Sequence, residues 1–242
     1  MPSAVEFRAA PTPGTEDRVH LDLVSAPQPR DKMVADHIRQ GVNSGILTPG
    51  SHLSESGLCS ELQVSRNTVR EAFRFLTQEG LLRHEANRGV FVTTPSPATI
   101  VDVFRVRRTI ECPALAQAYP KHPAVQQMRA AVKKAEASRR DGDWRAVGNA
   151  DIAFHAAVVA LTDSPRLMAF FRRVSLELRL VFGLIRSPEF LHEPYIERNR
   201  AILEALESGD AAGAAEQMDR YLAHAERFIL TTYARVLDGE DA

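Results

Sequence analysis

The chain has 242 residues, of which 44% are apolar and 25% charged, and its 30 basic residues are balanced by 31 acidic ones. This mixture is typical of a globular protein with a sizeable core, and it excludes a largely disordered or collagen-like chain. A formal net charge of −1 disfavours a protein that packages DNA without sequence preference, because such proteins neutralise many phosphates. Any site for a polyanion must therefore be local.

No uninterrupted apolar run reaches the ~18–20 residues that a membrane span needs, and the N-terminus lacks the apolar core of a secretion signal. We therefore expect a cytoplasmic protein with no membrane partner. The two cysteines, Cys59 and Cys112, form no CxxC pair, which favours free thiols in a reducing compartment.

Residues 1–29 are rich in proline and show no apolar periodicity, so we expect a flexible leader. Apolar residues then recur at helical spacing from Arg30, and Gly45 ends this first helix. Ser54 is a candidate N-cap for a short second helix that reaches Leu62.

A third helix follows Ser65 and is closed by Gly80. Residues 81–93 combine a turn-rich centre with β-favouring flanks, which predicts a small hairpin. Three helices and a hairpin in this order predict a winged helix-turn-helix domain, which we place at residues 30–95. The apolar stripe of the third helix consists of Val69, Ala72, Phe73 and Leu76.

The second domain begins after the interruption Thr94-Pro95-Ser96-Pro97 and contains only helix-period patterns. We expect a bundle of about six helices over residues 96–242, so that the fold class is mainly α. Pro113 predicts a kink or a break in the first of these helices. The expected helices are 98–118, 121–140, 143–162, 165–186, 193–208 and 210–236.

The start of the third helix has the residues needed to read DNA in the major groove. Ser65 as N-cap leaves backbone N–H groups free for a phosphate at a positive helix terminus. Arg66 and Arg70 lie four residues apart on one side of the helix, and Asn67 and Thr68 add short hydrogen-bonding groups. An arginine fork can bind guanine O6 and N7 or a phosphate.

The tip of the hairpin offers a second contact with DNA. Arg88 supplies a cation and Gly89 a bare backbone, next to the minor groove or its phosphates. Periodicity alone leaves the alternative of an ordinary solvated helix with arginines on its wet face.

Five segments of the N-terminal domain resemble the GntR family of bacterial transcription regulators, and the helical remainder resembles the FCD type of ligand-binding domain found in its FadR-like branch. The segments are GILTPG at 45–50, LSE at 53–55, VSRNTVREAF at 64–73, QEGLL at 78–82 and RGVFV at 88–92. The resemblance implies that Ser65, Arg66 and Arg70 contact the operator and that Gly89 belongs to the wing. One departure is Ser56, where the family often has an arginine, followed by Gly57 in place of an acidic residue.

Asp151 and His155 stand at i and i+4 in an otherwise apolar helix, so they share one face. Such a pair can chelate a divalent metal or form a plain hydrogen-bonded pair. The resemblance implies two further histidine ligands for a metal that in turn binds a carboxylate effector, but Asn199 and Tyr221 stand at those positions. Neutral amide and phenol are poor ligands for zinc or nickel. We therefore expect a degenerate site where zinc, nickel or manganese binds weakly or not at all, with His224 as a candidate third ligand.

The alternative to a metal is a polar pocket formed by Asp151, His155, Asn199 and Tyr221, which can hold an oxygen-rich metabolite by hydrogen bonds. Arg107 matches an arginine on the first helix of FCD domains and can meet an anionic effector or pair with Glu111 at i+4.

Arg179 is a second candidate cation for an effector. We expect the aromatic side chains at helical spacing to pack the bundle. These are Trp144, Phe170, Phe171 and Phe182.

Taken together, the sequence predicts a homodimeric transcriptional regulator that reads an inverted-repeat operator in double-stranded DNA. We expect a repressor whose binding responds to a small, carboxylate-bearing effector. The alternative is a metal-dependent hydrolase or lyase using Asp151 and His155. The lack of a third and fourth strong ligand and of GxSxG, HExxH or phosphate-loop motifs argues against an enzyme.

Overall fold

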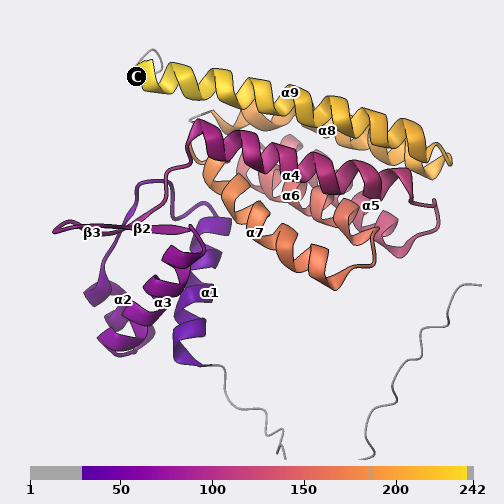
Figure 1. The fold of residues 1–242 in the computed structure, drawn as a ribbon. Coiled ribbons are helices and arrows are strands. Elements are labelled where there is room, and N and C mark those ends of the chain that lie inside the picture. The colour runs from indigo at the N-terminus through magenta and orange to yellow at the C-terminus, as the bar shows by residue number, and fades with distance from the viewer. Residues whose placement is uncertain (1–28, 186, 239–242) are drawn as a thin grey trace, which may run out of the picture.

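The structure is a computed structural model that describes residues 29–185 and 187–238, with side chains as far as residue 235. The predicted leader, residues 1–29, falls outside the described residues except at Pro29. Within the described part, the chain forms an N-terminal domain of three helices and a small sheet, followed by a bundle of six helices (Figure 1). The predicted fold class, a winged helix-turn-helix followed by an all-α domain, is confirmed.

The N-terminal domain contains α1 (Arg30–Asn43), β1 (His52–Leu53), α2 (Glu55–Leu62), α3 (Arg66–Gln78), β2 (Leu82–Glu85) and β3 (Gly89–Val92). The strands form an antiparallel sheet in the order β1-β3-β2, with Leu82 opposite Val92 and His52 opposite Phe91. The hairpin was predicted, whereas the two-residue strand β1 was not. The helices close on the apolar stripe of α3, where Val69 and Leu76 have no solvent exposure.

The bundle contains α4 (Pro97–Ala116), α5 (Pro123–Arg140), α6 (Trp144–Ala160), α7 (Pro165–Phe182), α8 (Pro188–Glu207) and α9 (Ala211–Asp238). In it α4 packs along α9, and α5 packs along α6. Of the kink or break predicted at Pro113, the break does not occur: this exposed proline lies in the last turn of α4, which continues to Ala116. The eighth helix begins five residues earlier than its predicted start at 193, since Pro188 occupies the first turn, where a missing N–H costs little.

The aromatic side chains expected in the bundle differ in burial. Phe171 is buried, and Trp144 and Phe182 are partly buried and packed against core residues. Phe170 is 46% exposed, so its predicted place in the core is wrong. It lies next to Phe171 on α7, and only one of two neighbouring helix positions can face the core there.

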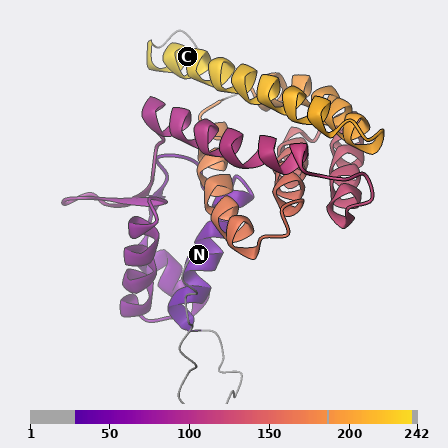
Figure 2. The same cartoon turned by 45° about the vertical axis from the view of Figure 1, so that its right-hand side comes forward.

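The two domains meet at α7. Figures 1 and 2 show α1 beside α7 and the β2–β3 hairpin pointing away from the bundle. Leu180 of α7 is buried in the core of the N-terminal domain, and Leu176 packs against it. Polar contacts add to this interface, since Arg173 lies 3.6 Å from Glu79 and Arg145 donates to the carbonyl of Ser44 at 3.2 Å.

Candidate functional site

The N-terminus of α3 is exposed and well capped. Ser65 has extended backbone angles, and its hydroxyl accepts from the backbone N–H of Thr68 at 3.1 Å and contacts the Thr68 hydroxyl at 2.8 Å. The first turn contains no acidic residue. Arg66 and Asn67 are exposed, and Arg66 makes no hydrogen bond or ion pair with the described part of the chain. The positive helix end therefore remains available to an anion.

Arg70 lies one turn further on and is held by an acidic partner. Its Nε lies 3.1 Å from both carboxylate oxygens of Glu55, at the start of α2. The hydrogen bond and the charge of Glu55 raise the pKa of Arg70, which therefore stays a cation. Arg70 must leave Glu55, or share its guanidinium with it, to contact DNA. Sequence analysis missed Glu55, because the two residues are 15 positions apart in the chain.

The wing is shaped by two residues with positive φ, Asn87 at 61° and Gly89 at 104°. A Cβ on Gly89 would lie 2.8 Å from Nε2 of His52, so this backbone accepts only glycine without strain. Arg88 pairs with Glu85 at 2.6 Å, and Arg83 pairs with the same carboxylate. The wing is thus less cationic than the sequence suggests.

Helix α3 and the wing, the β2–β3 hairpin, border one groove of about 350 Å³. Arg66 and Gly89 both line it, together with His52, Ser54 and His84. Two of the residues that the sequence assigned to DNA contact, from separate segments, thus lie on the same face of the domain. Ser56, which stands where the family often has an arginine, lines this groove with a short hydroxyl.

A second polar site is buried inside the bundle. It brings together Asp151 and His155 of α6, Asn199 of α8 and Tyr221 of α9, all of them buried. Asp151 Oδ1 accepts from Asn199 Nδ2 at 2.8 Å and from the Tyr221 hydroxyl at 2.9 Å. The same hydroxyl lies 3.0 Å from His155 Nε2. The four residues predicted as a polar pocket are therefore in mutual contact.

Arg107 joins this cluster from α4 through Glu111. Its Nε lies 2.8 Å from Glu111 Oε1, and the other carboxylate oxygen lies 2.5 Å from His155 Nδ1. Burial alone would raise the pKa of Glu111, but the charges of Arg107 and His155 outweigh it and lower the pKa. In the described part of the chain, Arg107 Nη2 is buried without a hydrogen-bond partner. The pairing with Glu111 is thus formed, and one donor of Arg107 remains free.

Asp151 is also held in its charged form. Burial would raise its pKa, yet His155, Arg107 and the amide of Asn199 together lower it. Tyr221 responds in the opposite way, because burial and the charge of Asp151 raise its pKa well above the usual value. A phenolate at Tyr221 is therefore disfavoured.

Two basic residues on neighbouring helices lie near the buried polar cluster, His192 of α8 and Arg179 of α7. Burial lowers the pKa of His192 to about 4, so this residue, whose ring meets the Phe182 ring edge to face with centroids 5.0 Å apart, is neutral at pH 7. Arg179 donates to Asn149, and its Nε is buried with no hydrogen-bond partner among the described residues. Sequence analysis named Arg179 as a candidate but missed His192.

The polar cluster borders a very small cavity. Its volume is about 10 Å³, and Arg107, Asp151, His192, Tyr195 and Tyr221 line it with five apolar residues. This is at most the space of one water molecule, so a metabolite enters only if the surrounding helices move apart.

The donor set of the cluster does not fit a metal ion. Among the described residues, no three His, Cys, Asp or Glu side chains are arranged to hold one. His224, the candidate third ligand, contacts the Tyr195 hydroxyl at 3.0 Å and belongs to a different hydrogen bond. The family implies a metal here, but a phenol and an amide replace two of its ligands.

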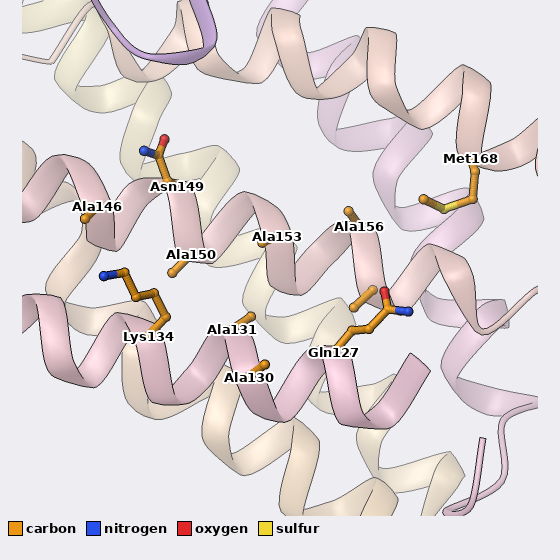
Figure 3. A pocket seen from close by; sticks show the side chains of 11 residues that line it. Gln127, Ala130, Ala131, Lys134, Ala146, Asn149, Ala150, Ala153, Ala156 and Met168 are labelled. Carbon is orange, nitrogen blue, oxygen red and sulfur yellow. The ribbon is translucent and has the colours of Figure 1, made fainter. Parts of the chain in front are cut away.

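A larger groove lies on the outside of the bundle between α5 and α6, with a volume of about 600 Å³ (Figure 3). Lys134 and Gln127 point across it from α5, and Met168 closes one end. Alanines line most of its remaining wall. Asn149 sits at its rim and connects it to Arg179. No feature of the sequence analysis identified this groove.

No helix in the described part of the chain is both long and apolar enough to cross a membrane. Comparison with known proteins gives two family matches. Residues 30–92 match the bacterial regulatory proteins of the gntR family, and residues 102–224 match the FCD domain.

Individual relatives agree with these matches. The chain is 27% identical over 193 residues to the probable D-xylose utilization operon transcriptional repressor of Paenarthrobacter nicotinovorans, covering 78% of this chain and 84% of that protein. It is 28% identical over 197 residues to the galactonate operon transcriptional repressor of Escherichia coli (strain K12), covering 71% and 85%. A crystal structure of a GntR transcriptional regulator from Rhodococcus sp. RHA1 shares 38% identity and a TM-score of 0.81, over 84% of this chain and 99% of that one.

The N-capped helix α3, the wing and the C-terminal helical bundle thus agree with both family matches and with the Rhodococcus structure. The chain belongs to the GntR family of DNA-binding transcriptional regulators, in the branch whose C-terminal domain is of the FCD type.

Proposed function

We propose that the protein represses transcription by binding, as a homodimer, an inverted-repeat operator through α3 and the wing. The observation that carries this proposal is the shared groove between Arg66 and Gly89, next to a capped and uncompensated helix N-terminus. A two-fold dimer presents two such surfaces, which matches the symmetry of an inverted repeat. Ser65, Asn67, Thr68, Arg70 and Arg88 complete the proposed DNA contacts.

Two of the relatives named above are described as repressors, one as the probable repressor of a D-xylose utilization operon and one as the repressor of the galactonate operon, which supports repression here. We propose that a small carboxylate-bearing effector binds at Arg107, Asp151, His155, Asn199 and Tyr221, and that it prefers the DNA-free form if it causes release. We also propose a cytoplasmic location, because an operator on chromosomal DNA is reached from there.

The rival function, a metal-dependent hydrolase or lyase, finds less support in the contacts. Asp151 and His155 are both engaged by the Tyr221 hydroxyl, and His155 is engaged by Glu111 as well. The cavity that Asp151 lines has a volume of only about 10 Å³. We therefore propose that the protein is not an enzyme.

The test is binding to DNA fragments that flank the gene for this protein, measured by mobility shift at several salt concentrations. One fragment should compete much better than random DNA, and Arg66→Ala should remove about 1–3 kcal/mol of that discrimination. Arg220→Ala is the matched control, because it removes an exposed arginine of α9, far from α3. Equal affinity for all fragments would refute the proposal.

A further inference from the structure

A carboxylate of α2 holds one of the arginines proposed to contact DNA. Glu55, the first residue of α2, accepts from Arg70 Nε of α3 with both of its oxygens, each at 3.1 Å. Glu55 also lines the groove shared by Arg66 and Gly89, and with Arg70 it lines a second groove of about 470 Å³. We propose that Glu55 is a positioning residue for operator recognition, which holds Arg70 by Nε and directs the free end of its guanidinium toward a guanine.

The pattern of donors on Arg70 supports this role. A guanidinium carries five N–H donors in one rigid plane. Glu55 takes only the Nε–H at the side of that plane, and within the described part of the chain neither Nη1 nor Nη2 of Arg70 has a partner. These two terminal nitrogens form the edge that matches O6 and N7 of guanine. The carboxylate therefore restricts the arginine without blocking the edge that reads a base.

The position of Glu55 is itself fixed by the start of α2. The Ser54 hydroxyl caps this helix by accepting from the backbone N–H of Gly57 at 3.1 Å, and it lies 3.1 Å from the Ser56 hydroxyl. A carboxylate in the first turn is favoured by the positive end of the helix. Because Leu58 of α2 is buried in the same core as α3, the carboxylate and the arginine keep one relative placement.

The exposure of the pair argues against a purely structural role. The Arg70 side chain is 65% exposed and the Glu55 side chain 33%, and exposed ion pairs of this kind contribute little to stability. A carboxylate beside the proposed DNA contacts also repels phosphates, which weakens binding to any sequence. Orientation of Arg70 accounts for its presence, because an arginine that is already held loses less rotamer freedom when it meets its base.

The neighbouring residue makes the pairing specific. Position 56, where the family often has an arginine, is a serine, so α2 offers Glu55 no cation at the next position. Among the described residues, Glu55 forms an ion pair only with Arg70. The charge of Glu55 is therefore directed to one reader, and its loss should affect one position of the operator.

This inference rests on the proposed function, because it concerns how α3 reads an operator. In the test, the full chain selects fragments from a duplex library of randomised sequence, and sequencing gives the base preference at each position. The wild type should enrich a motif with a guanine at the position whose preference Arg70→Ala abolishes. Glu55→Gln should weaken that preference roughly 5–10-fold and leave the other positions unchanged. Added to Arg70→Ala, Glu55→Gln should have no further effect on base preference.

Glu71→Gln is the matched control. It removes the same charge from α3, where Glu71 pairs with Arg74 at 2.9 Å, and leaves the contact between Glu55 and Arg70 in place. Both glutamine variants should bind random DNA more tightly than the wild type, since each removes a negative charge. Only Glu55→Gln should lose base preference. Its melting temperature should match that of the wild type, which separates the orientation of Arg70 from folding.

Three results would overturn the inference. If Glu55→Gln kept the full preference at the position read by Arg70, Glu55 would not direct that arginine, and the proposed function would be unaffected. If Glu55→Gln instead removed a cytosine preference at another position, Glu55 would itself read a base by accepting from cytosine N4. If the wild type enriched no motif, the proposed function would fail, and this inference with it.

Discussion

Glu111→Gln should be among the most destabilising single substitutions in the bundle. Glu111 has no solvent exposure, and its two oxygens accept separately from Arg107 at 2.8 Å and His155 at 2.5 Å. A glutamine amide can serve only one of these donors, because its NH₂ group would face the other. Breaking a buried ion pair in this way costs about 3–5 kcal/mol. With a urea slope of about 3 kcal/mol/M, the unfolding midpoint should fall by roughly 1–1.7 M.

The assay is equilibrium unfolding in urea, followed by the fluorescence of Trp144, the only tryptophan in the chain, which lies at the start of α6. Glu177→Gln is the matched control. This half-buried carboxylate of α7 has its pKa raised by burial and by Asp102, so losing its charge should cost little. If both substitutions lowered the midpoint equally, charge pairing by Glu111 would not be what holds α4 to α6.

Three further substitutions test local features. Gly89→Ala should cost about 1–3 kcal/mol of stability, since φ is 104° and the new Cβ would meet His52. The same change should weaken operator binding. Unchanged binding in a mobility-shift assay would contradict the assigned wing geometry. Gly148→Ala should lower the melting temperature through a cost of about 1–3 kcal/mol, because its Cβ would lie 2.5 Å from Nε2 of the packed His192. His192→Gln should flatten the acid limb of stability. The pKa of His192 is lowered to about 4, so the unfolded chain binds more protons between that value and 6.5, and the wild type should lose about 2 kcal/mol from pH 7 to pH 5 that the variant keeps. Urea midpoints at the two pH values check this, and equal losses would argue against a neutral His192.

Helix α3 could be predicted from the sequence because the residues that cap it and the residues that pattern it lie close together in the chain. The hydroxyl of Ser65 caps the helix over three residues, and the apolar stripe repeats within α3. The acidic partners of the arginines could not be predicted in the same way. Glu55 meets Arg70 only because α2 and α3 cross, and Glu85 meets Arg83 and Arg88 through the hairpin.

The buried site was found in part, for reasons that differ by residue. Asp151 and His155 share a helix face, so their spacing revealed them, whereas Asn199 and Tyr221 were located by resemblance alone. Glu111 was considered only as a partner of Arg107, because the contact with His155 joins two helices 44 residues apart. His192 had no signal at all, since the predicted helix began after it and left it outside any element.

Helix α7 joins the packing of the two domains. The chain passes from one domain to the other at residues 93–96, between β3 and α4, and α7 also belongs to both cores. Arg179 is placed on the side of Asn149 and the buried cluster, while the next residue, Leu180, is buried in the core of the N-terminal domain. Adjacent helix positions point about 100° apart, so a rotation or shift of α7 that moves one side chain must move the other. A ligand that binds Arg179 would therefore shift the surface of α7 on which α1 packs, without acting first through the connection between the domains.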